Sequence, residues 1–124
     1  MKPTLLLVDD EPMMQLLLKQ LFKADFDVNV FNNGKEALSW MYSGSIPDLA
    51  IFDLQMPEMD GYELLKHCKS SGYFQEVPII ILSAEETSSD RIKCLELGAI
   101  DYLVKPFNPK ELKLRVNRIL SITK

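Results

Sequence analysis

Short apolar runs alternate along the chain with stretches in which apolar residues recur at helical spacing. Continuous apolar runs lie at residues 4–8, 49–52, 77–82 and 102–104, and residues 26–30 alternate apolar with polar at period two. A continuous apolar run of this length, bounded by turn residues, indicates a strand buried on both faces. Strict alternation indicates a less buried strand near a sheet edge. The pattern therefore predicts five strands.

A helical pattern follows each predicted strand. Pro12 suits the first turn of the first helix, where its lack of an N–H costs nothing. Asn108 and Pro109 mark the cap and first turn of the last helix. The apolar positions that define the helices are Met13, Met14, Leu17, Leu18 and Leu21; Ala37, Leu38 and Met41; Leu64, Leu65 and Cys68; Ile92, Leu95 and Leu97, a weak pattern; and Leu112, Val116, Ile119 and Leu120.

Two apolar residues, Leu16 and Phe22, fall outside the predicted inner face of the first helix. Single exposed apolar residues usually carry no meaning. Here these additional apolar residues lie close in sequence to two consecutive aspartates, Asp9 and Asp10. A surface that docks a partner protein is therefore a second interpretation.

Five strands alternating with five helices predict an α/β fold. Buried parallel strands need crossover helices on both faces of the sheet, and the crossovers are right-handed. At 124 residues the natural choice is the flavodoxin-like (βα)5 three-layer sandwich, with strand order 2-1-3-4-5. The length predicts a single domain over residues 1–124, large enough to bury a core.

Polar residues with reactive or charged side chains follow four of the five strands. Asp9 and Asp10 follow the first strand, Asp53 the third, Ser83 the fourth and Lys105 the fifth. Because the carboxyl ends of parallel strands meet at one edge of a sheet, we expect these five side chains to lie together. Any one of them could simply terminate a buried strand. That explanation is weak for all five at the same edge.

This combination of side chains suits phosphoryl transfer. Clustered aspartates repel one another unless a cation lies between them, and Mg²⁺ prefers hard oxygen ligands. Lys105 would supply a point charge for a phosphoryl oxygen, and Ser83 a hydrogen-bond donor. A carboxylate such as Asp53 can attack phosphorus and form an aspartyl phosphate.

Composition narrows the classes of function. The hydrophobic content of 47% and the charged content of 26% are ordinary for a globular domain, and the formal charge of −4 argues against non-specific binding to nucleic acid. The sequence shows no signal-peptide pattern and no apolar run of membrane-spanning length, so we expect a cytoplasmic protein without membrane attachment. Cys68 and Cys94 are interpreted as reduced buried thiols, and His67 as a helix surface residue.

Four segments together resemble a known family. Val8-Asp9-Asp10, residues 53–57 with Gly61, Ser83-Ala84 and Lys105-Pro106-Phe107 are similar, in order and spacing, to the receiver domains of two-component response regulators. The resemblance covers the whole chain. It implies that Asp53 is the phosphoacceptor.

The resemblance also implies a role for the other site residues. Asp10, Asp53 and the backbone carbonyl of Gln55 would bind Mg²⁺, or Mn²⁺ in its place, and Asp9 would help directly or through water. Lys105 would contact the phosphoryl group, and the bond between Lys105 and Pro106 is expected to be cis, which would aim the lysine inward.

A conformational switch and two modulating residues are further implications of the resemblance. Ser83 would move toward the phosphoryl group and Tyr102 would turn inward behind it, altering the face made by the fourth helix, fifth strand and fifth helix. From its own context, Tyr102 would be an ordinary half-buried strand residue. Gln55 and Glu85 would flank the route of attacking water, so we expect replacing them to alter the lifetime of the acyl phosphate.

The implied partners follow from the same resemblance. A histidine kinase or a histidine phosphotransfer protein would supply the phosphoryl group. A downstream effector, or an output domain outside this chain, would receive the signal. Homodimers through the fourth helix, fifth strand and fifth helix are common in the family, but no residue here requires one. The chain would act as a stand-alone receiver or as part of a longer regulator.

Three alternatives remain open from the sequence. A phosphatase of the haloacid dehalogenase-like type needs a second Asp two residues after the nucleophile, where this chain has Gln55. A nucleotide- or flavin-binding module needs a glycine-rich loop after the first strand, where this chain has Asp10-Glu11-Pro12. A degenerate receiver would act as an interaction module without phosphorylation.

Overall fold

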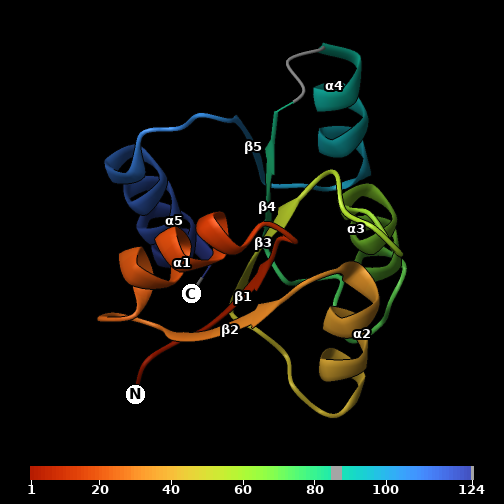
Figure 1. The fold of residues 1–124 in the computed structure, drawn as a ribbon. Helices are drawn as coiled ribbons and strands as arrows, with labels where there is room; N and C mark the ends of the chain where they lie inside the picture. The colour runs from red at the N-terminus through yellow and green to blue at the C-terminus, as the bar shows by residue number, and fades with distance from the viewer. Residues whose placement is uncertain (85–87, 124) are drawn as a thin grey trace.

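Strands and helices alternate through the chain in the computed structural model, which describes residues 1–84 and 88–123 (Figure 1). The strands are β1 (Thr4–Val8), β2 (Asp27–Phe31), β3 (Leu49–Asp53), β4 (Ile79–Ser83) and β5 (Asp101–Val104). The helices are α1 (Pro12–Phe22), α2 (Gly34–Tyr42), α3 (Gly61–Lys69), α4 (Ser88–Leu97) and α5 (Pro109–Thr123). Within the described residues, no helix combines the length and the apolar character needed to cross a membrane.

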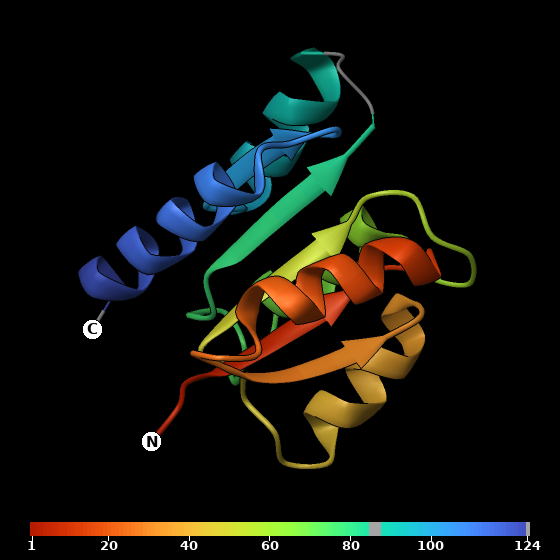
Figure 2. The same ribbon diagram turned by 60° about the vertical axis from the view of Figure 1, so that its left-hand side comes forward.

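The five strands form one parallel sheet in the order β2-β1-β3-β4-β5, which confirms the predicted topology. Val8 at the end of β1 pairs with Phe31 of β2 and Phe52 of β3. The strand with alternating pattern, β2, lies at one edge of the sheet and is less buried than the others, as predicted. All the strands point toward the same edge, so the residues that follow them meet there (Figure 2).

Two apolar clusters cover the two faces of the sheet. Successive side chains of a strand point to opposite faces, so Leu6 and Val8 join one cluster while Leu5 and Leu7 join the other. The first cluster packs under α2, α3 and α4, and the second under α1 and α5 (Figure 1). The result is the predicted three-layer sandwich.

The inner face of α1 differs from the predicted one. Phe22, predicted to lie outside the inner face, is fully buried and packs edge-on against Phe26 with ring centroids 5.5 Å apart. Met13 and Leu17, predicted to face inward, are 71% and 42% exposed. Leu18 is the other buried residue, and it shares a helix face with Phe22 at a spacing of four residues. The face of α1 that is buried against the sheet is therefore rotated from the predicted one.

Helix α4 also departs from expectation. Ile92 and Leu95 are exposed, and Cys94 is the buried residue of the helix.

Both cysteines are buried and free, as predicted, and burial raises the pKa of the Cys68 thiol to about 12. His67 is exposed, as predicted. Among residues 109–122 of α5, the buried ones are the four predicted.

Candidate functional site

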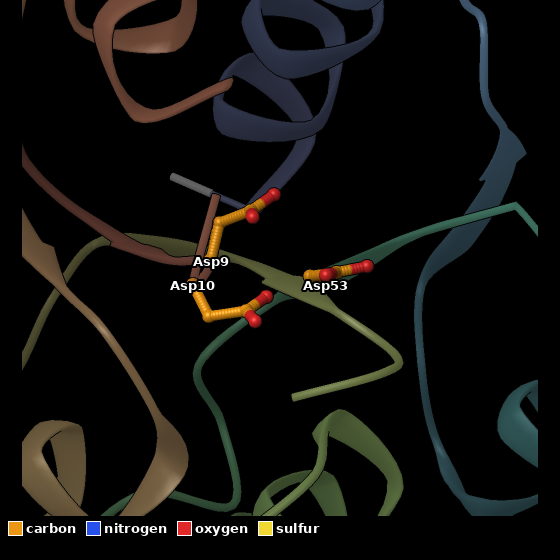
Figure 3. A group of neighbouring side chains, drawn as sticks. All are labelled: Asp9, Asp10 and Asp53. Atoms are coloured by element: carbon orange, nitrogen blue, oxygen red, sulfur yellow. The ribbon is translucent and has the colours of Figure 1, made fainter. Parts of the chain in front are cut away.

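Three carboxylates meet at the end of the two central strands (Figure 3). Asp9 and Asp10 directly follow β1, and Asp53 is the last residue of the neighbouring β3. Each carboxylate has one oxygen that lies within 4.8 Å of an oxygen of each of the other two. Asp9 and Asp53 are 2% and 8% exposed, whereas Asp10 is exposed to solvent. This set of hard oxygen donors, partly open to water, fits a divalent cation such as Mg²⁺ or Mn²⁺.

Lys105 closes the other side of the acidic cluster. Its Nζ lies 3.2 Å from Asp9 Oδ2 and 3.2 Å from Asp53 Oδ1. The residue follows β5, and its backbone N–H donates to the Ser83 carbonyl at 2.8 Å. The peptide bond between Lys105 and Pro106 is cis, as predicted. One ammonium therefore contacts two of three carboxylates, and the cluster keeps a net negative charge that favours a cation.

Burial and neighbouring charges shift the acidities of this pair. Burial raises the pKa of the Asp53 carboxyl, the charge of Asp9 raises it further, and Lys105 opposes both without cancelling them. Burial lowers the pKa of the Lys105 ammonium, but Asp53 and Asp9 together raise it more, so the net shift is upward. The lysine therefore stays charged next to a carboxylate that is easier to protonate than usual.

The β3–α3 connection folds tightly back over the nucleophile candidate. The Gly61 N–H donates to the Leu54 carbonyl at 2.9 Å, and a Cβ added to Gly61 would lie 2.2 Å from the Asp53 carbonyl oxygen. Only glycine permits this approach. Glu58, with φ of 67°, supplies the left-handed turn within the same connection. Gln55 is exposed in this segment and lines a cleft of about 390 Å³ beside α4.

Ser83 and Tyr102 lie next to each other, and the Ser83 carbonyl accepts from the N–H of Lys105. Ser83 is fully buried, and Tyr102 is 7% exposed, so it is buried rather than half-buried. Burial raises the pKa of the Tyr102 phenol, and a hydrogen bond with the Ser83 side chain partly offsets the rise. The Arg91 guanidinium of α4 lies 5.8 Å from the centre of the Tyr102 ring. The two residues expected to form a switch are thus in direct contact, and Arg91 of α4 lies over the ring of one of them, Tyr102.

A sequence model of the response regulator receiver domain matches residues 5–117 of the chain. The chain belongs to the response regulator receiver domain family. It is similar to a probable transcriptional regulator, ycf27, of Porphyridium aerugineum, with 42% identity over 120 residues that cover 96% of this chain and 48% of the relative. The chain thus spans about half the length of that curated relative.

Solved receiver structures share the fold closely. A putative response regulator from Chloroflexus aurantiacus J-10-fl superposes with a TM-score of 0.90 and 38% identity, covering 98% of this chain and 99% of that one. The receiver domain of the sensor histidine kinase PA1611 from Pseudomonas aeruginosa PAO1 gives a TM-score of 0.87 and 29% identity over 98% and 99% of the two chains. That structure holds a magnesium ion coordinated in its active-site cleft.

The structure of this receiver brings together the five residues predicted to meet at the sheet edge. They are Asp9, Asp10, Asp53, Ser83 and Lys105, and each follows or ends the strand predicted for it. Ser83 is joined to the group through its backbone carbonyl, which accepts from the Lys105 N–H. Glu85 lies outside the described residues, so the prediction of its role stays a prediction.

Two contacts that shape the receiver site could not be predicted from the sequence. Gln15 of α1 donates from its side-chain amide to the Asp9 carbonyl, a contact that joins residues six apart across a turn. Gly61 belongs to a segment that resembles the family, but its close approach to Asp53 depends on the path of the folded loop.

Proposed function

We propose that Asp53 is the phosphoacceptor of this receiver domain. The observation that carries the proposal is the convergence of Asp9, Asp10 and Lys105 on the Asp53 carboxylate, at the sheet edge where α/β folds build their sites. The phosphoryl donor would be the phosphohistidine of a histidine kinase or of a histidine phosphotransfer protein. An Asp53 oxygen forms a bond to phosphorus while the bond between phosphorus and the imidazole nitrogen breaks, and the imidazole leaves with that electron pair.

The residues around Asp53 would balance the negative charge of the carboxylates and of the phosphoryl group. Asp9, Asp10, Asp53 and the Gln55 backbone carbonyl would hold a Mg²⁺ or Mn²⁺ ion, which neutralises charge on the carboxylates and on the phosphoryl oxygens when bound. Lys105, already 3.2 Å from Asp53 Oδ1, would move its contact to a phosphoryl oxygen. Water then attacks the phosphorus of the acyl phosphate, the bond to Asp53 breaks, and inorganic phosphate leaves. The domain would catalyse only these two steps on itself.

The contact between Ser83 and Tyr102 supports a switch that reads the state of Asp53. The Ser83 hydroxyl would turn to the phosphoryl group, and its hydrogen bond with Tyr102 would change with it. Tyr102 belongs to β5 and touches Arg91 of α4, so the face formed by α4, β5 and α5 would respond. A downstream effector, an output domain outside this chain, or a second copy of the receiver would bind that face.

Exposed apolar side chains of α1 would form part of the surface that meets the kinase. Met13, Leu16 and Leu17 are exposed on α1, the helix that begins two residues after Asp10. Apolar residues gathered beside a site favour protein docking.

A single receiver domain over residues 1–124, without direct nucleic-acid or membrane binding, is part of this proposal. The cytoplasmic location stays a prediction.

The alternatives predict different outcomes of one experiment. The protein is mixed with Mg²⁺ and acetyl phosphate, and the intact mass is measured. We expect a gain of one phosphoryl group that chelation of Mg²⁺ prevents and that Asp53→Asn abolishes. Asp27→Asn, which changes an exposed aspartate at the opposite end of the sheet, should leave the adduct unchanged.

A lack of adduct at saturating donor and Mg²⁺ would favour a degenerate receiver that binds partners without phosphorylation. Repeated turnover of a generic phosphate ester would favour the phosphatase of the haloacid dehalogenase-like type, although Gln55 stands where that enzyme needs its second aspartate. The arrangement of Asp9, Lys105 and Asp53 favours phosphorylation over both.

A further inference from the structure

The side-chain amide of Gln15 joins three parts of the chain around the acidic cluster. Its Nε2 donates to the Asp9 backbone carbonyl at 2.5 Å and to Asn32 Oδ1 at 2.8 Å. An amide nitrogen carries two hydrogens, so both donors of this group are used. Gln15 lies in α1, Asp9 follows β1, and Asn32 follows β2, so one half-buried side chain fixes the relative position of three elements.

The link continues from Asn32 to the segment that carries the phosphoacceptor candidate. The Asn32 N–H donates to Glu36 Oε1 at 3.1 Å, and the Glu36 N–H donates to Asn33 Oδ1 at 2.9 Å, which caps α2. The next residue, Gly34, donates its N–H to the Met59 carbonyl at 3.1 Å. Met59 belongs to the β3–α3 connection that follows Asp53. A hydrogen-bonded path thus runs from Asp9 to that connection, with Gln15 as its first member.

The carbonyl held by Gln15 belongs to the peptide bond between Asp9 and Asp10. Because the peptide is planar, fixing this carbonyl sets the direction in which the Asp10 backbone leaves. In the part of the chain that the structure describes, the Asp10 carboxylate has no hydrogen-bond or ion-pair partner, so its direction depends on the backbone. Asp9 is fixed further by the Glu11 N–H, which donates to its Oδ1 at 2.9 Å, and by its own N–H, which donates to the Phe31 carbonyl at 3.1 Å.

We propose that Gln15 is a positioning residue that holds the Asp9–Asp10 peptide so that the three carboxylates converge on a divalent cation. The inference rests on the proposed function, since it concerns the same cation site. Gln15 does not touch the cation or the phosphoryl group. It acts on the affinity of the site for the cation, because it keeps Asp10 in one direction among several that the side chain could otherwise adopt.

The first test measures Mg²⁺ binding by titration calorimetry in the complete chain. Gln15→Met keeps the length of the side chain and removes both donors. It should weaken Mg²⁺ binding about 10-fold, the low end for a residue that supports a metal ligand indirectly. Phosphorylation by acetyl phosphate should slow at limiting Mg²⁺ and recover at saturating Mg²⁺. Gln20→Met, an exposed change on the same helix, is the matched control and should bind as the wild type does.

A double-mutant cycle tests the connection to Asn32. Asn32→Ala removes one acceptor of the amide and should weaken Mg²⁺ binding less than Gln15→Met does. The double variant should be no weaker than Gln15→Met alone, because Asn32 acts through Gln15. Full additivity would show that the two residues act separately and would overturn the proposed link.

The side-chain amide of Gln15 can also be observed directly in the wild-type protein by nuclear magnetic resonance, which needs no stable variant. With both hydrogens bonded, its exchange with water should be slower than that of the exposed Gln20 amide. Equal exchange, or an unchanged Mg²⁺ affinity in both Gln15→Met and Asn32→Ala, would overturn the inference. Wild-type protein that binds no Mg²⁺ at all would instead contradict the proposed function.

Discussion

Lys105 Nζ lies at the same distance, 3.2 Å, from Asp53 Oδ1 and from Asp9 Oδ2. The lysine follows β5, and the two aspartates lie at the ends of β3 and β1. The ammonium of a residue that follows a third strand thus holds together two carboxylates that repel each other. Phosphorylation of Asp53 would change this contact first, because a phosphoryl oxygen would compete for the ammonium.

The first prediction concerns the acidity of Asp53 in metal-free protein. Its pKa should lie above the ordinary 3.8, because burial and the charge of Asp9 outweigh the effect of Lys105. Lys105→Met should raise this pKa further, and Asp9→Asn should lower it. Carboxyl ¹³C magnetic resonance measures both titrations. A midpoint that stays in place in Lys105→Met would contradict the ion pair.

The second prediction concerns stability, and its sign follows from the same pKa. The folded pKa of Asp53 lies above the unfolded one, so the free energy of unfolding falls as pH rises through that interval and stays lower above it. Asp53→Asn should therefore raise the thermal midpoint at neutral pH in a chelator. Differential scanning calorimetry measures the midpoint, with Asp27→Asn as the control. An equal or lower midpoint in Asp53→Asn would count against the account.

Added Mg²⁺ should reduce that difference. A ligand at ten times its dissociation constant stabilises the folded state by about 1.4 kcal/mol. The wild type should gain this amount, and Asp53→Asn should gain less because it lacks one of three carboxylates. The same calorimetric scans, repeated with Mg²⁺ in place of the chelator, provide the comparison. Equal gains in both proteins would place the cation elsewhere.

The third prediction concerns Gly61, the first residue of α3, and Gly72, which lies beyond the end of that helix. Gly61→Ala would place a methyl 2.2 Å from the Asp53 carbonyl oxygen, so the backbone must shift, at about 2 to 3 kcal/mol. The phosphorylation rate should fall as well, because the shift moves Asp53. Gly72→Ala meets no atom within 4 Å and should change stability by less than about 1 kcal/mol. Urea unfolding compares the two, and equal costs would contradict the loop geometry.

The fourth prediction tests which face of α1 is buried. Phe22→Ala removes a fully buried ring from the cluster under α1 and α5, and should destabilise the fold by about 3 to 5 kcal/mol. Leu17→Ala, on the exposed face, should cost less than about 0.5 kcal/mol. Urea unfolding measures both free energies. A larger cost at Leu17 than at Phe22 would restore the face predicted from the sequence.

Much of the site could be predicted from the sequence for a simple physical reason. Parallel strands place their carboxyl ends at one edge, so the order of apolar runs was enough to bring Asp9, Asp53 and Lys105 together. Local chemistry also predicted the cap of α5, where Asn108 Oδ1 accepts from the Lys110 N–H at 2.9 Å. These features depend on the spacing of apolar residues, on the order of the apolar runs and on residues that are close together in the sequence.

What the sequence could not predict depends on how elements are turned relative to one another. The rotation of α1 decides that Phe22 is buried and Leu17 is not, and several apolar residues lie on more than one face of that helix. The same rotation brings Gln15 to the Asp9 carbonyl. The path of the β3–α3 connection decides that Gly61 touches Asp53. Each of these contacts depends on tertiary packing rather than on a local pattern.

The most direct test of the central claim locates the phosphoryl group. Protein incubated with acetyl phosphate and Mg²⁺ is treated with borohydride, which reduces an aspartyl phosphate to homoserine, and the digested peptides are sequenced by mass spectrometry. We predict homoserine at position 53, dependent on both donor and Mg²⁺, and absent when Mg²⁺ is chelated. Homoserine at Asp9, at Asp10 or elsewhere, or unmodified Asp53 at saturating donor and Mg²⁺, would contradict the account.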